Sequence, residues 1–157
     1  TSEGPEQGAT VEIRIPLHDS LAMPDTEKSA PELSGTTSIL IVEDAAGSRD
    51  MLARSLRLLG HSVVDIGSGE DALRQCEAAV PDVILLDIDL PGISGYDVAR
   101  TLRKKWSRND CLIIALTGFG RPEDQQQARE AGCDAHIVKP TSPAELLSAI
   151  QELQATE

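Results

Sequence analysis

The chain has 157 residues, of which 40% are hydrophobic and only 2% aromatic, and its formal net charge is −12. A strongly acidic chain is poorly suited to nucleic acid or to an anionic membrane surface, so we expect a soluble protein that meets cations or basic protein surfaces. The scarcity of aromatic residues predicts an aliphatic core, which is typical of parallel strands covered by helices.

The cysteines and the hydrophobic runs indicate a cytoplasmic protein. Cys76, Cys111 and Cys133 show no CxxC or Cys/His ligand spacing, so we expect reduced thiols that pack as small hydrophobic side chains. No apolar stretch approaches the roughly 20 residues that a membrane-spanning helix needs, and no signal peptide is visible. A longer parent protein would still be free to carry a membrane anchor upstream.

The first 35 residues differ in composition from the rest, with four of the nine prolines and seven acidic against two basic residues. The alternating run at residues 10–17 predicts a short strand with one apolar face, and the polar stretch 18–35 predicts a linker. An isolated strand is not stable, and the chain begins with Thr1 rather than Met. We therefore expect a piece of a longer protein, with residues 1–17 as the remnant of another domain.

From residue 36 onward, strand and helix patterns alternate. Short aliphatic runs predict five strands, at residues 38–42, 62–66, 82–87, 112–116 and 135–138. Helical spacing of apolar residues follows each strand, at residues 46–59, 69–79, 95–105, 122–131 and 143–154. Gly60 and Gly132 stand where helix C-caps are expected, and Ser142 stands at an N-cap position. This alternation predicts an α/β fold with a parallel sheet.

Polar side chains stand at the ends of four predicted strands. They are Glu43 and Asp44 after the first, Asp87 at the end of the third, Thr117 after the fourth and Lys139 after the fifth. Ligands of open α/β sheets bind at the carboxyl ends of strands, so we expect these side chains to converge on one edge. Neighbouring carboxylates repel unless a cation intervenes, and Mg²⁺ prefers such oxygen ligands. The sequence therefore predicts a Mg²⁺ site there, with Mn²⁺ as the alternative ion.

Three further residues lie beside this predicted site. Asp89 either orders its loop or offers its backbone carbonyl to the metal. Gly118 leaves room next to Thr117 for a bulky anion, and Pro140 favours a cis bond that would direct Lys139. A carboxylate nucleophile, a divalent cation, a hydroxyl and an ammonium are together the components of phosphoryl transfer.

The motifs at the strand ends resemble those of response-regulator receiver domains of two-component signalling. They are ILIVED at residues 39–44, LLDIDLPGISG at 85–95, ALTG at 115–118 and VKP at 138–140. For residues 36–157 the resemblance implies a flavodoxin-like (βα)5 three-layer sandwich with a five-stranded parallel sheet of order 2-1-3-4-5. It also implies Mg²⁺-dependent transfer of a phosphoryl group from a phosphohistidine to Asp87 in a phosphorelay.

The same resemblance implies a role for each site residue. These roles are direct Mg²⁺ ligation by Asp44, Asp87 and the backbone carbonyl of Asp89, water-mediated binding by Glu43, and phosphoryl contacts by Thr117 and Lys139. One position departs from the family pattern, because His136 stands where receivers usually carry a Tyr or Phe that swings inward on phosphorylation. His136 is either a weaker or pH-sensitive switch or an edge-strand histidine with no switching role.

A second resemblance concerns the N-terminal stretch. Residues 8–17 are similar to the last strand of a histidine-kinase ATP-binding domain, which implies the C-terminal receiver of a hybrid sensor histidine kinase. The parent would then be a protein-histidine kinase, whereas this chain holds no kinase core and would only phosphorylate and dephosphorylate itself. The implied partners are a phosphohistidine donor, from its own or a partner kinase, and a histidine phosphotransfer protein. Neither nucleic acid nor direct membrane contact is expected.

Three other interpretations remain open. The first is a stand-alone single-domain response regulator. The second is an aspartate-nucleophile phosphatase, because Asp87 and Asp89 match the paired aspartates of haloacid-dehalogenase-type enzymes; that family, however, wants Thr or Val where this chain has Pro91. The third is a degenerate receiver used only for protein contact, although all the acceptor residues are present. A generic phosphomonoester and acetyl phosphate would distinguish the first two by steady turnover or by a single acyl phosphate.

Overall fold

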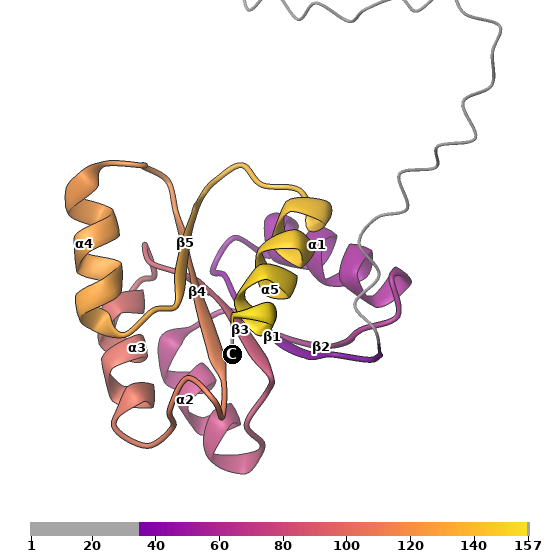
Figure 1. Ribbon diagram of the computed structural model, residues 1–157, viewed down its shortest axis with the longest axis horizontal. Helices are drawn as coiled ribbons and strands as arrows, with labels where there is room; N and C mark the ends of the chain where they lie inside the picture. The colour runs from indigo at the N-terminus through magenta and orange to yellow at the C-terminus, as the bar shows by residue number, and fades with distance from the viewer. Residues whose placement is uncertain (1–34, 157) are drawn as a thin grey trace, which may run out of the picture.

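Strands and helices alternate along residues 35–156, which are the residues that the structure, a computed structural model, describes (Figure 1). The strands are β1 (Ser38–Val42), β2 (Ser62–Ile66), β3 (Val83–Asp87), β4 (Leu112–Thr117) and β5 (Ala135–Val138). The helices are α1 (Ala46–Leu58), α2 (Gly69–Ala78), α3 (Gly95–Arg103), α4 (Pro122–Ala131) and α5 (Pro143–Ala155). The predicted domain remnant at residues 1–17, and the predicted linker apart from its last residue, lie outside the described residues.

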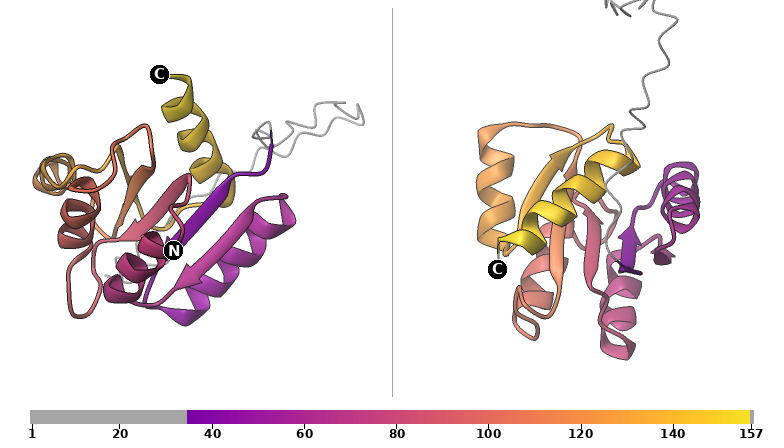
Figure 2. Two further views of the ribbon diagram at one scale, coloured as in Figure 1. Left: turned by 90° about the horizontal axis from the view of Figure 1, so that it is seen from below. Right: turned by 45° about the vertical axis from the view of Figure 1, so that its right-hand side comes forward.

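The five strands form one parallel sheet of order β2-β1-β3-β4-β5. Helices α1 and α5 cover one face, and α2, α3 and α4 cover the other, as the views from three directions show (Figure 1, Figure 2). The predicted flavodoxin-like three-layer arrangement is therefore confirmed. None of the described helices is both long enough and apolar enough to cross a membrane.

Two aliphatic layers fill the space between the sheet and its helices. Successive strand residues point to opposite faces, so Leu40 and Ile84 enter the layer beneath α2, α3 and α4, while Ile39 and Leu85 enter the layer beneath α1 and α5. Every residue of β3 and β4 is buried, because helices cover both faces of these central strands. This explains why their sequences run apolar without alternation. Each fully buried Leu or Ile side chain contributes about 1.5–3 kcal/mol.

The three cysteines lie in the layer beneath α2, α3 and α4, and all three are free and buried. Burial raises the pKa of Cys76 to about 11 and the pKa of Cys111 and Cys133 to about 12. Since the thiolate is the reactive form, these side chains act as small hydrophobic groups, as their spacing predicts.

Several helix ends follow from local capping chemistry. The Ser142 hydroxyl accepts the backbone N–H of Glu145, whose carboxylate accepts the Ser142 N–H, and together they form a capping box that starts α5. Gly132 ends α4 with a left-handed φ of 93°. An added Cβ at Gly132 would also lie 2.5 Å from the Arg103 side chain. Both conformation and space therefore require glycine at this position.

A partly buried ion pair joins the end of α3 to the amino end of the sheet. Arg103 pairs with Asp134 and also donates hydrogen bonds to the carbonyls of Gly132 at 2.7 Å and Cys111 at 2.8 Å. The Asp134 carboxylate in turn accepts the backbone N–H of Ile113 at 2.7 Å. One carboxylate thus satisfies a guanidinium and a strand N–H in a site from which water is largely excluded.

His61, at the start of β2, lies at the end of the sheet opposite to the predicted site. The side chain is buried, and its Nδ1 accepts the backbone N–H of Thr37 at 3.4 Å. Burial lowers the pKa of His61 from its ordinary value of 6.5. The unfolded chain therefore takes up a proton at His61 as pH falls below 6.5, at pH values where the folded chain does not.

We expect the unfolding free energy of the wild-type protein to include a contribution from His61 that is full above pH 6.5 and is lost as pH falls from there toward the lowered pKa. His61→Gln keeps an acceptor for Thr37 without a titrating group, so its stability should depend less steeply on pH. Urea unfolding followed by far-ultraviolet circular dichroism between about pH 8 and about pH 5 measures this slope. Equal slopes for both proteins would contradict the assignment.

Candidate functional site

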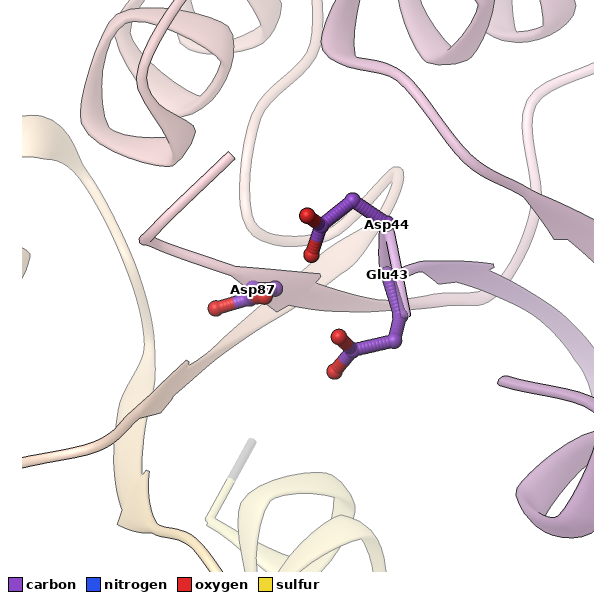
Figure 3. A group of neighbouring side chains, drawn as sticks. All are labelled: Glu43, Asp44 and Asp87. Atoms are coloured by element: carbon purple, nitrogen blue, oxygen red, sulfur yellow. The ribbon is translucent and has the colours of Figure 1, made fainter. Parts of the chain in front are cut away.

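Three carboxylates meet at the carboxyl edge of the sheet. Glu43 and Asp44 directly follow β1, and Asp87 is the last residue of the neighbouring strand β3. Figure 3 shows the side chains of these three residues gathered around a common space. One carboxylate oxygen from each lies within 4.8 Å of the others. Asp87 is 2% exposed and Glu43 5% exposed, whereas Asp44 is open to solvent.

Lys139, which follows β5, places its ammonium group between two of these acids. Its Nζ lies 3.0 Å from Glu43 Oε2 and 3.2 Å from Asp87 Oδ2. Burial opposes the charged form of Lys139, but the hydrogen bond to Glu43 and the charge of Asp87 together raise its pKa. The lysine is therefore held as a cation against the acids. The Lys139–Pro140 peptide bond is cis, as the sequence predicts.

The three carboxylates outnumber the single ammonium group of Lys139. Burial raises the pKa of Glu43, and so does the nearby charge of Asp87, while the hydrogen bond from Lys139 opposes the shift. One oxygen of Asp87 faces Lys139, and the other accepts the backbone N–H of Asp89 at 3.0 Å. Clustered carboxylate oxygens that are short of positive charge are the ligand set of a hard divalent cation, so these residues fit Mg²⁺.

Thr117, the last residue of β4, is 4% exposed at the same edge. Its hydroxyl lies 2.7 Å from the carbonyl oxygen of Phe119 and 2.8 Å from Nε2 of His136. A Cβ added at Gly118 would lie 3.7 Å from the Asp89 carboxylate, which is an ordinary contact. Space beside Asp89 therefore does not by itself require glycine at this position.

Arg49, in the first turn of α1, supports the acidic pair, although no sequence pattern singles it out. One of its guanidinium nitrogens donates to the Glu43 carbonyl at 2.8 Å, and another lies 3.5 Å from the Asp65 carboxylate. The arginine thus connects the backbone after β1 to the end of β2. In the sequence it is indistinguishable from a solvated arginine on the polar face of a helix, because its partners are defined only by tertiary packing.

We expect Arg49→Met to weaken Mg²⁺ binding by roughly three- to tenfold, because the Glu43 carbonyl loses a charged donor and the acidic pair loses its fixed position. Arg54→Met is the matched control, since Arg54 lies on the same helix in an exposed pair with Asp50. Isothermal titration with Mg²⁺ measures both affinities. The positioning role is wrong if Arg49→Met binds Mg²⁺ as tightly as Arg54→Met.

The sequence of most of this domain matches a known protein family. Residues 39–151 match the family model described as the response regulator receiver domain. The chain belongs to the response regulator receiver domain family. The match includes four of the five strands completely and takes in all the site residues described above.

The receiver domain is similar in sequence to named regulatory proteins. It is 38% identical over 120 residues to a probable transcriptional regulator, ycf27, of Guillardia theta. The matched residues are 76% of this chain and 46% of the relative. It is 38% identical over 114 residues to the phosphate regulon transcriptional regulatory protein PhoB of Pseudomonas aeruginosa, covering 73% of this chain and 50% of the relative. The receiver domain thus spans about half the length of these curated relatives.

Solved structures give the same result for the fold. The chemotaxis protein CheY4 of Vibrio cholerae matches the receiver domain with a TM-score of 0.71 at 28% sequence identity. The match covers 76% of this chain and 99% of CheY4. The predicted membership of the receiver family is confirmed together with the fold.

Proposed function

We propose that this receiver domain accepts a phosphoryl group on Asp87 from a phosphohistidine donor, in a reaction that depends on Mg²⁺. The observation that carries the proposal is the grouping of a buried carboxylate, Asp87, with Glu43, Asp44 and the Lys139 ammonium. A free carboxylate is a competent nucleophile toward phosphorus and forms an acyl phosphate. Cationic groups beside it stabilise the charge on the equatorial phosphoryl oxygens.

We assign a separate role in phosphoryl transfer to each of several residues at this site. The Asp89 N–H holds one oxygen of Asp87, while the other oxygen, next to Lys139, is the one we assign to attack phosphorus. In that step the new oxygen–phosphorus bond forms as the bond to the donor histidine nitrogen breaks. Lys139 then moves its hydrogen bonds from the carboxylates to a phosphoryl oxygen, and Thr117 donates to another.

The metal ligands that we propose are Asp44, Asp87 and the backbone carbonyl of Asp89, with Glu43 acting through water. When bound, Mg²⁺ would offset the negative charge of the acids and of the incoming phosphoryl oxygens. Since oxygen ligands of this kind accept either ion, Mn²⁺ is the expected substitute.

A groove beside the acidic residues supports the proposal that the phosphoryl donor is a protein. It has a volume of about 700 Å³, lies between α1 and the segment that leads from β5 into α5, and opens onto Glu43 and Lys139. Its walls are largely apolar and include Leu52, Pro140 and Met51, which is 71% exposed. An amphipathic helix fits such a surface. We propose that the donor histidine reaches Asp87 from a helix that is seated here.

We infer that the parent protein is a response regulator rather than a hybrid sensor histidine kinase. The interpretation as a hybrid kinase depends on residues 8–17, which the structure does not describe. The curated relatives are named as transcriptional regulators, which supports the alternative of a regulator outside a kinase. Because these relatives extend well beyond the matched region, the expectation that nucleic acid is not a partner is unconfirmed for the parent protein. The linker at residues 18–35 and a cytoplasmic location remain proposals.

Acetyl phosphate tests the proposed activity. Incubated with Mg²⁺, the protein should gain one acid-stable, base-labile phosphoryl group per chain, and the gain should disappear when EDTA removes the metal. A purified histidine phosphotransfer protein in its phosphorylated form should label the same residue. Steady hydrolysis of a generic phosphomonoester would instead support the phosphatase interpretation. A folded protein that acquires no label from either donor would contradict the proposal.

A further inference from the structure

Met51 holds the one sulfur atom of residues 35–156 that belongs to an exposed side chain. Met51 is 71% exposed, whereas Cys76, Cys111 and Cys133 are buried. Burial also raises the pKa of Cys76 to about 11 and the pKa of the other two thiols to about 12, so they are not reactive thiolates at neutral pH. A thioether reacts through a sulfur lone pair and needs no deprotonation. An oxidant that attacks sulfur therefore reaches Met51 first.

Small neighbours on α1 leave this side chain uncovered. A long side chain in a helix leans over the turn that precedes it, and for Met51 this turn contains Gly47 and Ser48. Ser55, one turn further along, is also small, and its hydroxyl turns back to donate to the Met51 carbonyl at 2.9 Å. None of these residues is large enough to shield the sulfur from solvent. The exposure of Met51 thus follows from its neighbours on the helix.

Met51 also forms part of the wall of the groove in which we propose that the donor helix is seated. The other apolar side chains that line this groove are Leu52, Leu116, Pro140 and Pro143. The hydrogen bonds and ion pairs that Glu43, Asp87 and Lys139 make within residues 35–156 do not involve the Met51 side chain. A chemical change at this sulfur therefore alters the groove and leaves the contacts of the acidic residues in place.

A sulfoxide at Met51 would make this wall polar. Its oxygen is a hydrogen-bond acceptor that is costly to bury without a donor. Of the side-chain donors that line the groove, Ser55, Thr141 and Lys139 are already bonded within the domain, which leaves the exposed Ser48 and water. An apolar helix seated in the groove would displace this water without replacing its hydrogen bonds, so the docked state would be weakened.

We propose that Met51 is a modification site at which a peroxide oxidises the thioether to a sulfoxide and thereby weakens docking of the protein donor. In this step the sulfur lone pair attacks the terminal oxygen of the peroxide and the oxygen–oxygen bond breaks. The other oxygen takes up the proton of the transferred one and leaves as water or an alcohol. Sulfur loses two electrons, which the peroxide gains. The inference rests on the proposed function, because it requires a phosphohistidine donor in this groove.

Hydrogen peroxide tests the proposal on the full chain. Met23→Leu removes the other methionine of the chain, and intact-mass spectrometry with peptide mapping then shows whether one oxygen atom is added at Met51. We expect the oxidised protein to accept phosphoryl groups from a phosphorylated histidine phosphotransfer protein roughly five- to hundredfold more slowly, measured as kcat/KM. Labelling by acetyl phosphate and Mg²⁺ should keep its rate, because a small donor needs no helix seated in the groove.

Two substitutions, made in the same background, separate the sulfoxide from other effects of peroxide. Met51→Leu keeps an apolar wall without a sulfur, so peroxide treatment should not change its own rate of transfer from the protein donor. Met51→Gln places a polar oxygen near the position of the sulfoxide oxygen, so its transfer should be slow before any peroxide is added. A methionine sulfoxide reductase with a thiol should restore transfer to the oxidised protein, since it returns the thioether.

The outcomes separate this inference from the proposed function. An untreated protein that no phosphorylated phosphotransfer protein labels would refute the proposed donor, and the inference with it. A protein that is labelled before treatment, but resists oxidation at Met51 or accepts phosphoryl groups at full rate with the sulfoxide, would overturn the inference alone. A loss of transfer that also occurs in Met51→Leu would overturn it too, as would an equal loss of labelling by acetyl phosphate.

Discussion

Asp87→Asn should abolish labelling by acetyl phosphate and Mg²⁺, because an amide oxygen lacks the negative charge that makes a carboxylate oxygen nucleophilic toward phosphorus. The fold should survive the change. Asn has nearly the same size and can still accept the Asp89 N–H, and Lys139 keeps its hydrogen bond to Glu43. We expect the unfolding free energy to change by less than about 1 kcal/mol in the absence of metal.

Asp97→Asn is the matched control for this experiment, because Asp97 is an exposed residue of α3 that pairs with Arg100 on the protein surface. This variant should be labelled as fully as wild type. Intact-mass spectrometry counts the phosphoryl groups, and borohydride trapping followed by peptide mapping locates the acyl phosphate. Stoichiometric labelling of Asp87→Asn, on any residue, would refute Asp87 as the acceptor.

Asp134→Ala should destabilise the protein by about 3 kcal/mol, because a partly buried guanidinium loses its charged hydrogen-bond partner. The Asp134 side chain is 7% exposed. Its loss would also leave the Ile113 N–H at the start of β4 without an acceptor. A typical domain has only about 5–15 kcal/mol of stability, so this single change should remove a large share of it.

Asp50→Ala tests whether any Asp–Arg pair would have the same effect. Asp50 lies 2.9 Å from Arg54 in an exposed pair on α1, and its loss should cost about 0.5 kcal/mol or less. Urea unfolding followed by circular dichroism measures both variants. Asp134→Asn should fall between them, because it keeps an acceptor for Ile113 but loses the charge. A loss in Asp134→Ala no larger than that in Asp50→Ala would contradict the role of the partly buried pair.

Much of the fold follows from local sequence signals. The central strands are uninterrupted aliphatic runs because helices bury both of their faces, and the capping residues Ser142 and Gly132 mark helix ends by their own chemistry. Helix ends without such a signal are predicted less accurately. The apolar spacing predicts a helix over residues 95–105, whereas α3 ends at Arg103. The backbone N–H groups of Lys105 and Trp106 both bond to Leu102, which closes the turn there.

Strand-end chemistry likewise makes the candidate site predictable from the sequence. In a parallel sheet all carboxyl ends meet at one edge, so polar residues after separate strands must converge, as Glu43, Asp87 and Lys139 do. Their roles in phosphoryl transfer remain predictions that the Asp87→Asn experiment and the metal titrations test.

The amino-acid sequence alone specifies the fold, the family and the strand-end residues, because these depend on burial patterns and on a topology that those patterns imply. Which side chains meet is a property of the tertiary structure. Lys139 bonds to Glu43 across 96 positions of sequence, and His136 takes Thr117 as its partner. The pairs Arg49–Asp65 and Arg103–Asp134 are of the same kind. Such partners depend on how helices pack and on which way side chains turn, and residue order along the chain encodes neither directly.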